Sequence, residues 1–201
     1  MRRAALVLAA SLAGCAGGGP PPPDWQVNAR QSLAAFERLY FAGESALAET
    51  EFRRARREIS ATGRLDLLAR AELMRCAVRV ASLEFDDCPG FEALRGDAGA
   101  EERAYADALA GRVARHAPAA EGDALARLVE AGVRLRRAEL SPEGMARAAE
   151  IASARGWRRP LAAWLGVLKR RAEEAGEREA AARFGRRLDA VLGGGGGGAA
   201  R

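Results

Sequence analysis

Residues 24–63 read DWQVNARQSLAAFERLYFAGESALAETEFRRARREISATG, and this stretch decides the fold. Its apolar side chains recur at helical spacing: Leu33, Phe36, Leu39 and Tyr40 in the first run, then Leu47, Ala48, Phe52, Ala55 and Ile59 in the second. Asp24 is placed to cap the first helix, and Gly43 and Gly63 suit the left-handed position that ends a helix. The stretch therefore predicts helices over 24–42 and about 44–61, folded back on each other as an antiparallel hairpin.

The same pattern continues to about residue 192. Further helices are predicted over 66–85, 100–115, 123–138, 142 to about 156, 160–175 and onward to about 192, with a short one after the turn at Pro89-Gly90. Ser141 and Pro142 form a start signal, because serine caps a helix and proline fits its first position. The chain has 48 alanines but 13 Val, Ile and Thr residues together, a balance that excludes a β-sheet fold. We expect one all-α domain over 25–192, built from antiparallel helical hairpins.

The first hairpin resembles a tetratricopeptide repeat. Gly43 lies at the turn, and Ala48, Phe52 and Ala55 follow at the spacings with which that repeat packs its two helices together. The last pair repeats this placement with Trp164, Leu168, Ala180 and Phe184. The chain departs from the repeat at Ser32 and Ser60, and its middle does not keep a 34-residue period. The resemblance implies a short α-solenoid, and a non-repetitive helical bundle is the alternative.

The first fifteen residues, MRRAALVLAASLAGC, read as an export signal. Arg2 and Arg3 precede an apolar run that is too short to cross a bilayer as a helix, which needs about 20 residues. The segment Leu12-Ala13-Gly14-Cys15 resembles the lipobox of bacterial lipoproteins. That resemblance implies removal of residues 1–14 as a signal peptide and lipidation of Cys15, and Ala16 after the cysteine favours the outer membrane. An ordinary secretory signal is the alternative.

The two ends of the mature chain are predicted to lie outside the folded domain. Residues 15–24 form a tether rich in glycine and proline, and the four prolines before Asp24 favour an extended chain. Residues 193–201 begin with six glycines and are expected to be disordered. Loss of Arg2 and Arg3 with the signal lowers the formal charge from +5 to about +3. This near balance, in an exported protein, argues against binding to nucleic acid.

Cys76 and Cys88 are the two cysteines besides Cys15, and in an exported chain they predict a disulfide. On one continuous helix twelve residues would separate them by about 18 Å, well beyond the reach of a disulfide. The bridge therefore requires the third helix to end near residues 83–85 and the chain to turn back. Two free thiols are the alternative, and a redox-active pair is disfavoured because no Cys-X-X-Cys motif is present.

No set of catalytic or metal-binding residues is recognisable, and we expect neither an enzyme nor a cofactor. His116 is the sole histidine, and Asp86-Asp87 read as residues of a helix-end turn. Arg53-Arg54 and Arg56-Arg57 read as a solvated helix face, with an acidic partner or lipid headgroups as the functional alternative. Trp157 with Arg158 and Arg159 reads as a staple between helices, with the rim of a binding surface as the alternative.

These features together predict a lipoprotein of the cell envelope, facing the periplasm and tied to the membrane through Cys15. The layout of lipobox, proline run and arginine-rich helices resembles a group of proteobacterial lipoproteins that implies no particular activity. Stacked helical hairpins favour a module that binds a protein partner or acts as a scaffold. The alternatives are an enzyme or accessory of peptidoglycan metabolism and a structural or solute-binding periplasmic protein.

Overall fold

The computed structural model describes residues 21–113 and 123–193. These ranges contain nine α-helices and no strand: α1 (Asp24–Ala42), α2 (Ser45–Ser60), α3 (Leu65–Ala81), α4 (Pro89–Glu92), α5 (Ala100–Leu109), α6 (Ala124–Arg136), α7 (Pro142–Ala154), α8 (Arg158–Glu174) and α9 (Arg178–Gly193). The all-α prediction is therefore confirmed for the described part of the chain.

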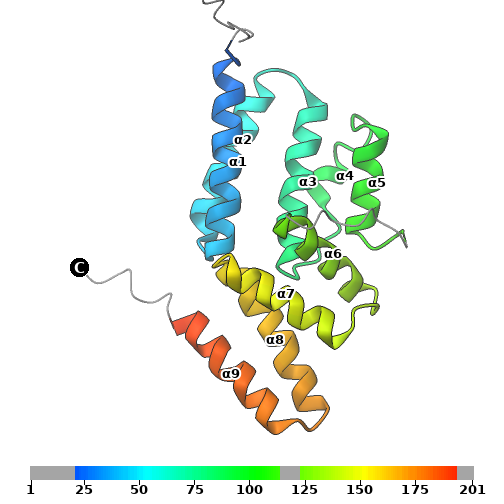
Figure 1. Ribbon diagram of the computed structural model, residues 1–201. Helices are drawn as coiled ribbons and strands as arrows, with labels where there is room; N and C mark the ends of the chain where they lie inside the picture. Colours follow the sequence, from blue (N-terminus) through cyan, green and yellow to red (C-terminus); the bar gives the residue numbers. More distant parts are fainter. Residues whose placement is uncertain (1–20, 114–122, 194–201) are drawn as a thin grey trace, which may run out of the picture.

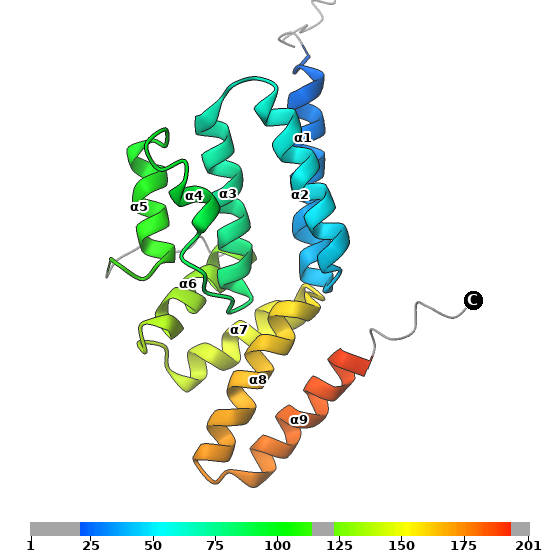
Figure 2. The same cartoon turned by 180° about the vertical axis from the view of Figure 1, so that it is seen from behind.

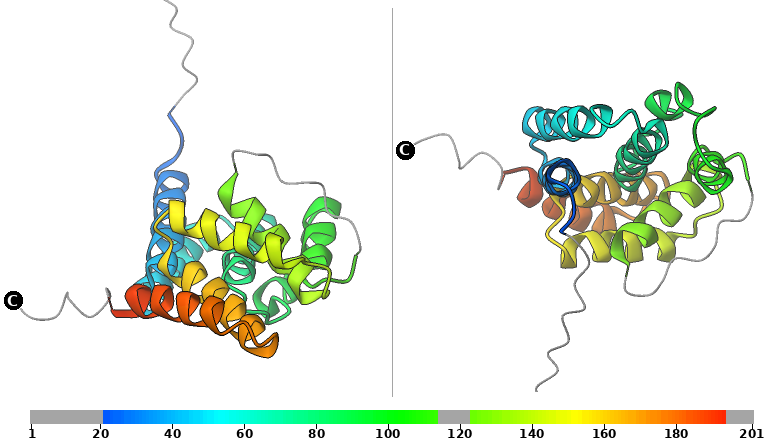
Figure 3. Two further views of the ribbon diagram at one scale, coloured as in Figure 1. Left: turned by 60° about the horizontal axis from the view of Figure 1, so that its bottom comes forward. Right: turned by 90° about the horizontal axis from the view of Figure 1, so that it is seen from above.

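Helix α3 lies at the centre of the upper part of the molecule, between the α1–α2 hairpin and α5 (Figures 1 and 3). Ten of its 17 residues are buried, whereas α9 buries only Ala181. The α8–α9 hairpin occupies the opposite end from the start of α1 in both side views (Figures 1 and 2). The chain thus begins at one end of the molecule and forms its last turn at the other.

Aromatic packing joins α1 to α2. The rings of Phe36 and Phe52 lie 5.1 Å apart, and both side chains are almost completely buried. Burial of each phenylalanine contributes on the order of 2 kcal/mol, because its apolar surface is removed from water. The prediction that Leu47 belongs to this core is wrong: its side chain is 56% exposed. Leu47 precedes the buried Ala48 by one residue, and a step of about 100° around the helix directs its side chain away from α1.

Close backbone approach joins α3 to α6, and a tryptophan joins α3 to α8. A Cβ atom on Gly132 would lie 2.5 Å from the carbonyl oxygen of Val80, so a residue without a side chain is needed there. Trp164 is fully buried, and its Nε1 donates a hydrogen bond to the carbonyl oxygen of Ala81 at 3.2 Å. This bond satisfies one carbonyl at the end of α3, where no helical partner remains.

Several helix ends differ from the predictions. Asp24 is the first residue of α1 rather than its cap, since Pro23 holds the cap position. Helix α3 ends at Ala81 instead of Phe85, and α5 ends at Leu109 instead of Arg115. The predicted start at Ser141 is confirmed: its Oγ accepts a hydrogen bond from the Gly144 N–H at 3.2 Å. The early end of α3 matters most, because it lets the chain turn back toward Cys76.

No helix in the described ranges is both long enough and apolar enough to cross a bilayer.

Candidate functional site

The structure joins Cys76 and Cys88 in a disulfide, with their Cα atoms 5.5 Å apart. Cys76 lies on the last turns of α3, and Cys88 immediately precedes α4. Both side chains are buried, at 4% and 6% exposure. The bridge therefore fastens the segment after α3 onto α3 itself, as the sequence predicts.

The turn that makes this bridge possible has an unusual backbone. Leu83, Asp87 and Cys88 all have φ between +54° and +61°, the left-handed region that residues with side chains rarely adopt. A carboxylate supports the turn, because Asp86 Oδ1 accepts a hydrogen bond from the Cys88 N–H at 3.2 Å. An aspartate carboxylate that accepts a hydrogen bond from the backbone N–H two residues later is typical of tight turns. Asp86 therefore acts here as the turn residue that the sequence indicates.

Cys76, Asp86 and Cys88 also bring three potential metal ligands within 4.8 Å of one another. A metal would need both thiolates free, but the two sulfurs are bonded to each other. The Asp86 carboxylate is also engaged, since its Oδ2 lies 3.1 Å from Arg79 Nε. The cluster fits a disulfide-closed turn and does not fit a metal site.

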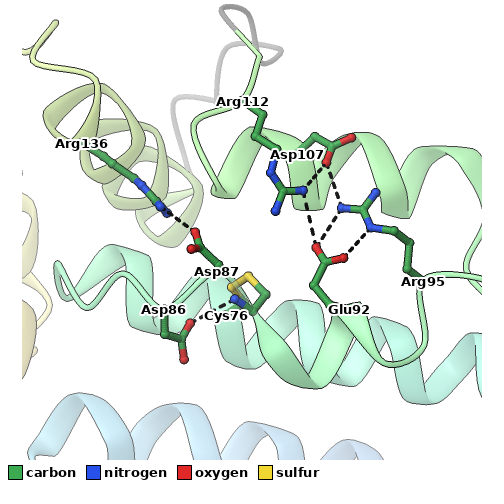
Figure 4. A network of polar contacts seen from close by, with 9 residues as sticks. Cys76, Asp86, Asp87, Glu92, Arg95, Asp107, Arg112 and Arg136 are labelled. Atoms are coloured by element: carbon green, nitrogen blue, oxygen red, sulfur yellow. Dashed lines mark hydrogen bonds and ion pairs between the residues drawn. A yellow bond between two sulfur atoms is a disulfide. The ribbon is translucent and has the colours of Figure 1, made fainter.

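An ion-pair network holds α4 and α5 together (Figure 4). Arg95 bridges Glu92 at 2.7 Å and Asp107 at 2.8 Å, and Arg112 reaches the same Asp107 oxygen at 2.8 Å. Hydrogen bonds from Arg95 lower the pKa values of both Glu92 and Asp107. Two arginines and two carboxylates balance each other, so this network leaves no free charge for a substrate.

The second carboxylate of the Asp86-Asp87 pair is also paired with an arginine. Asp87 Oδ1 lies 2.6 Å from Arg136 Nη2, which links the turn to α6 (Figure 4). The hydrogen bond from Arg136 lowers the pKa of Asp87. A general acid needs a raised pKa, so Asp87 is unsuited to that role.

Glu72 is a buried carboxylate that the sequence analysis did not single out. It faces α2 from α3, and its Oε1 lies 2.9 Å from Arg56 Nη1, while its own side chain is 3% exposed. Burial raises its pKa, and the charges of Arg56 and Arg75 oppose that effect. Its position four residues after Leu68 and four before Cys76 places it on the buried face of α3, a signal that the sequence did contain.

Arg159 joins its own helix α8 to α1 and α2. Its Nε donates to the Tyr40 carbonyl oxygen at 2.8 Å, its Nη1 lies 3.0 Å from Glu84 Oε1, and its Nη2 donates to Ser45 Oγ. The guanidinium carbon also lies 4.3 Å from the centre of the Tyr40 ring. Burial and the nearby Glu84 raise the pKa of the Tyr40 hydroxyl, which stays protonated.

The neighbours of Arg159 complete the same joint. Arg158 Nη1 donates to the Ala42 carbonyl oxygen at 3.1 Å, and the Trp157 ring lies 4.5 Å from the Phe41 ring. The carbonyls at the end of α1 carry partial negative charge, so cationic donors there are favourable. The prediction that residues 157–159 form an interhelix staple is confirmed, and these side chains are not free to form a binding rim.

The cavities beside these clusters are too small for a typical substrate. One of about 80 Å³ lies against the disulfide and Glu72, and another of about 160 Å³ lies between α5 and α6. Small-molecule sites usually measure about 300–1,000 Å³. The Arg159 guanidinium that donates to Ser45 Oγ stays charged and cannot act as the base that a serine nucleophile needs.

A larger groove lies between α7, α8 and α9, with a volume of about 350 Å³. Its floor and walls are mostly apolar and come from Pro142, Ala146, Leu168, Ala172, Ala175, Ala180 and Phe184. Glu143, Arg171, Glu177 and Arg183 stand at its edges. The groove is thus lined by apolar side chains together with two negative and two positive groups.

The four arginines in the middle of α2 differ in whether they form an ion pair. All four arginines are exposed, but Arg56 pairs with the buried Glu72, whereas Arg53, Arg54 and Arg57 have no such partner among the described residues. Arg53 Nη2 donates to Thr50 Oγ1 at 3.1 Å. The prediction of a solvated face is therefore confirmed for all four arginines.

Cys15, His116, the signal at 1–14 and the last eight residues lie outside the described residues. The predicted tether 15–24 is described from Pro21 onward, and Asp24 belongs to α1.

Comparison with protein-family models found no match, and comparisons with curated proteins and with solved structures found no significant similarity.

Proposed function

We propose that this chain is a lipid-anchored protein of the cell envelope that binds a protein partner through the groove between α7, α8 and α9. The anchor is a diacylglycerol group on Cys15, and residues 16–23 connect it to α1. The observation that carries the proposal is the groove itself, whose apolar floor lies open beside charges of both signs.

The remainder of the described molecule supports a binding role over catalysis. Its clustered carboxylates are paired with arginines, as in the Glu92–Arg95–Asp107 network and the Asp87–Arg136 pair. Groups engaged in this way stabilise a fold and are poor candidates for proton transfer. The floor of the groove, in contrast, exposes apolar surface that gains free energy when a partner covers it.

The partner we expect presents one or two apolar side chains flanked by charges of both signs, as at the end of a helix. The groove lies near the α8–α9 turn, at the opposite end of the molecule from residue 24 (Figure 2). The groove is therefore remote from the point where the tether enters α1. This arrangement suits an adaptor in envelope assembly or cell-wall maintenance, on the periplasmic side of the outer membrane.

Site-specific photo-crosslinking in intact cells tests the groove. A benzophenone amino acid at Ala146, in the groove, is expected to capture a defined partner, and the same group at the exposed Ala182 of α9 is the matched control. Ala146→Arg should fill the groove and abolish capture by a probe at Ala180, whereas Ala182→Arg should leave capture unchanged. Equal capture from Ala146 and Ala182 would contradict the proposal.

The anchor has its own test. Cys15→Ser should leave an unprocessed precursor and remove the protein from the detergent phase on Triton X-114 partitioning, because the lipobox then lacks the cysteine that carries the lipid. Processing and partitioning like the unchanged protein would show that Cys15 is not lipidated.

A further inference from the structure

We propose that the solvent-facing side of α2 binds an anionic lipid surface next to the tether. The residues concerned are Leu47, Thr50, Arg53, Arg54 and Arg57, called the α2 stripe below. The proposal rests on the proposed lipid anchor, which would place this surface at a membrane.

The α2 stripe is a continuous face of the helix. At 3.6 residues per turn its five members fall within an arc of about 120°. The buried side chains Ala48, Phe52, Ala55 and Ile59 occupy the opposite side, against α1. Glu51 and Glu58 lie outside the arc and are partly buried. The exposed arc therefore contains three positive charges and no negative one.

The three arginines of the stripe are available to a ligand. In the described part of the chain, no carboxylate lies within ion-pair distance of Arg53, Arg54 or Arg57, although Arg56 beside them pairs with Glu72. Guanidinium groups match phosphate oxygens well, because they donate two parallel hydrogen bonds. Three such groups on one helix face form a surface suited to phosphate headgroups.

An exposed leucine favours a lipid surface over other polyanions. Leu47 is 56% exposed on the same arc as Arg54, and nothing in the α1–α2 core requires it there. Helices that lie on membranes combine basic side chains with apolar ones that enter the headgroup region. A purely electrostatic partner would gain nothing from Leu47.

The position of the stripe agrees with this interpretation. Helices α1 and α2 run antiparallel, so the second half of α2 lies beside the first half of α1, where residues 21–23 enter (Figure 1). A proline-rich segment such as 16–23 spans about 25 Å when extended. The tether is long enough to let α2 lie against the bilayer. It also holds α2 at a high local concentration, so that a weak contact suffices.

Vesicle binding of the full-length chain carrying Cys15→Ser tests the proposal without the lipid. The probe is a pair of vesicle preparations, phosphatidylcholine alone and phosphatidylcholine with phosphatidylglycerol. An arginine near an anionic surface raises partitioning about fivefold, so Arg53→Gln, Arg54→Gln and Arg57→Gln together should lower the preference for anionic vesicles by up to about 100-fold. Leu47→Ala should lower binding to anionic vesicles by a smaller factor.

The matched control removes the same charge from the opposite end of the molecule. Arg170, Arg178 and Arg186 are exposed on the α8–α9 hairpin, and their replacement by glutamine should leave the preference for anionic vesicles almost unchanged. All variants share residues 1–14, so the signal cannot produce a difference among them. Circular dichroism confirms that each variant is folded.

Three results would overturn the proposal: no preference for anionic vesicles, an unchanged preference in the α2 triple variant, or an equal loss in the control. Binding to an acidic protein but not to vesicles would give the first of these results. The outcome is independent of the Cys15 test in cells. Failure there with success here would remove the anchor and keep the lipid surface.

Discussion

The α1–α2 hairpin and the segment from Ser82 to Leu109 both pack on α3, but their own helices are joined by different contacts. The hairpin is joined by aromatic burial around Phe36 and Phe52. The segment has one four-residue helix and a ten-residue helix; the disulfide ties it to α3 and the Arg95 network joins α4 to α5, in addition to burial of Phe91 and Leu109. Long amphipathic helices supply enough apolar surface to hold themselves in place, whereas a short irregular segment needs a covalent bond or paired charges.

Removal of the Phe52 ring should give the largest effect. Phe52→Ala leaves a cavity against Phe36, and comparable substitutions cost about 3–5 kcal/mol of unfolding free energy. Urea unfolding followed by circular dichroism measures this loss. Leu47→Ala on the same helix is the control, and its effect should stay within about 0.5 kcal/mol because that side chain is exposed. Similar losses for the two variants would mean that the aromatic core does not hold the hairpin.

Removal of the disulfide should come next. Replacing Cys76 and Cys88 by alanine opens a short covalent loop, which in the chain-entropy model costs about 3 kcal/mol. For a domain of this size the melting temperature should fall by roughly 6–12 °C. Mass spectrometry after alkylation without reductant tests the bond directly. Two alkylated thiols in protein purified without reductant would show that the segment is held without the disulfide.

Addition of a single methyl group at Gly132 should destabilise the contact between α3 and α6. Gly132→Ala places a Cβ 2.5 Å from the Val80 carbonyl oxygen, and overpacking of this kind costs about 1–3 kcal/mol. Gly166→Ala in α8 is the matched control, since the nearest atom to its new Cβ is the end of Arg170 at 3.7 Å. The control should be stabilised by roughly 0.5–1 kcal/mol, because alanine favours a helix. Thermal unfolding distinguishes the two signs.

The smallest expected effects are on the pH dependence of the unfolding free energy, which should be opposite for Glu72, beside the α1–α2 hairpin, and Asp107, in the segment from Ser82 to Leu109. Burial raises the pKa of Glu72, so its contribution to stability is greatest below the unfolded pKa and is lost as pH rises through the folded pKa. Hydrogen bonding to Arg95 lowers the pKa of Asp107, so its contribution is present above the unfolded pKa and is lost as pH falls. Unfolding free energies between about pH 3 and pH 8 should therefore diverge in opposite directions for Glu72→Gln and Asp107→Asn, each relative to the unchanged protein. Parallel curves for the two variants would contradict both assignments.

The helices, the hairpins and the pairing of Cys76 with Cys88 could all be predicted from the amino-acid sequence. Helical periodicity is local, since apolar residues three and four positions apart must share a face, and the glycine at position 43 marks the turn between two such faces. The disulfide could be predicted equally well, because Cys76 and Cys88 flank the point where the helical spacing of apolar residues breaks into a turn. Exposure of Leu47 follows from its spacing, since Ala48, Phe52, Ala55 and Ile59 share one face of α2 and Leu47 lies outside it, but the apolar character of leucine favoured the wrong assignment.

Tertiary structure decided which charges are partnered and which remain free. Arg53, Arg54, Arg56 and Arg57 are equivalent in sequence, yet only Arg56 meets the buried Glu72 on α3. The joint at Arg159 likewise depends on carbonyls and side chains from α1, α2 and the turn after α3, up to 119 positions away in the chain. The groove between α7, α8 and α9 is a property of three helices together. Such features depend on how helices pack in space, and helical periodicity specifies the face of each helix but not the neighbour that covers it.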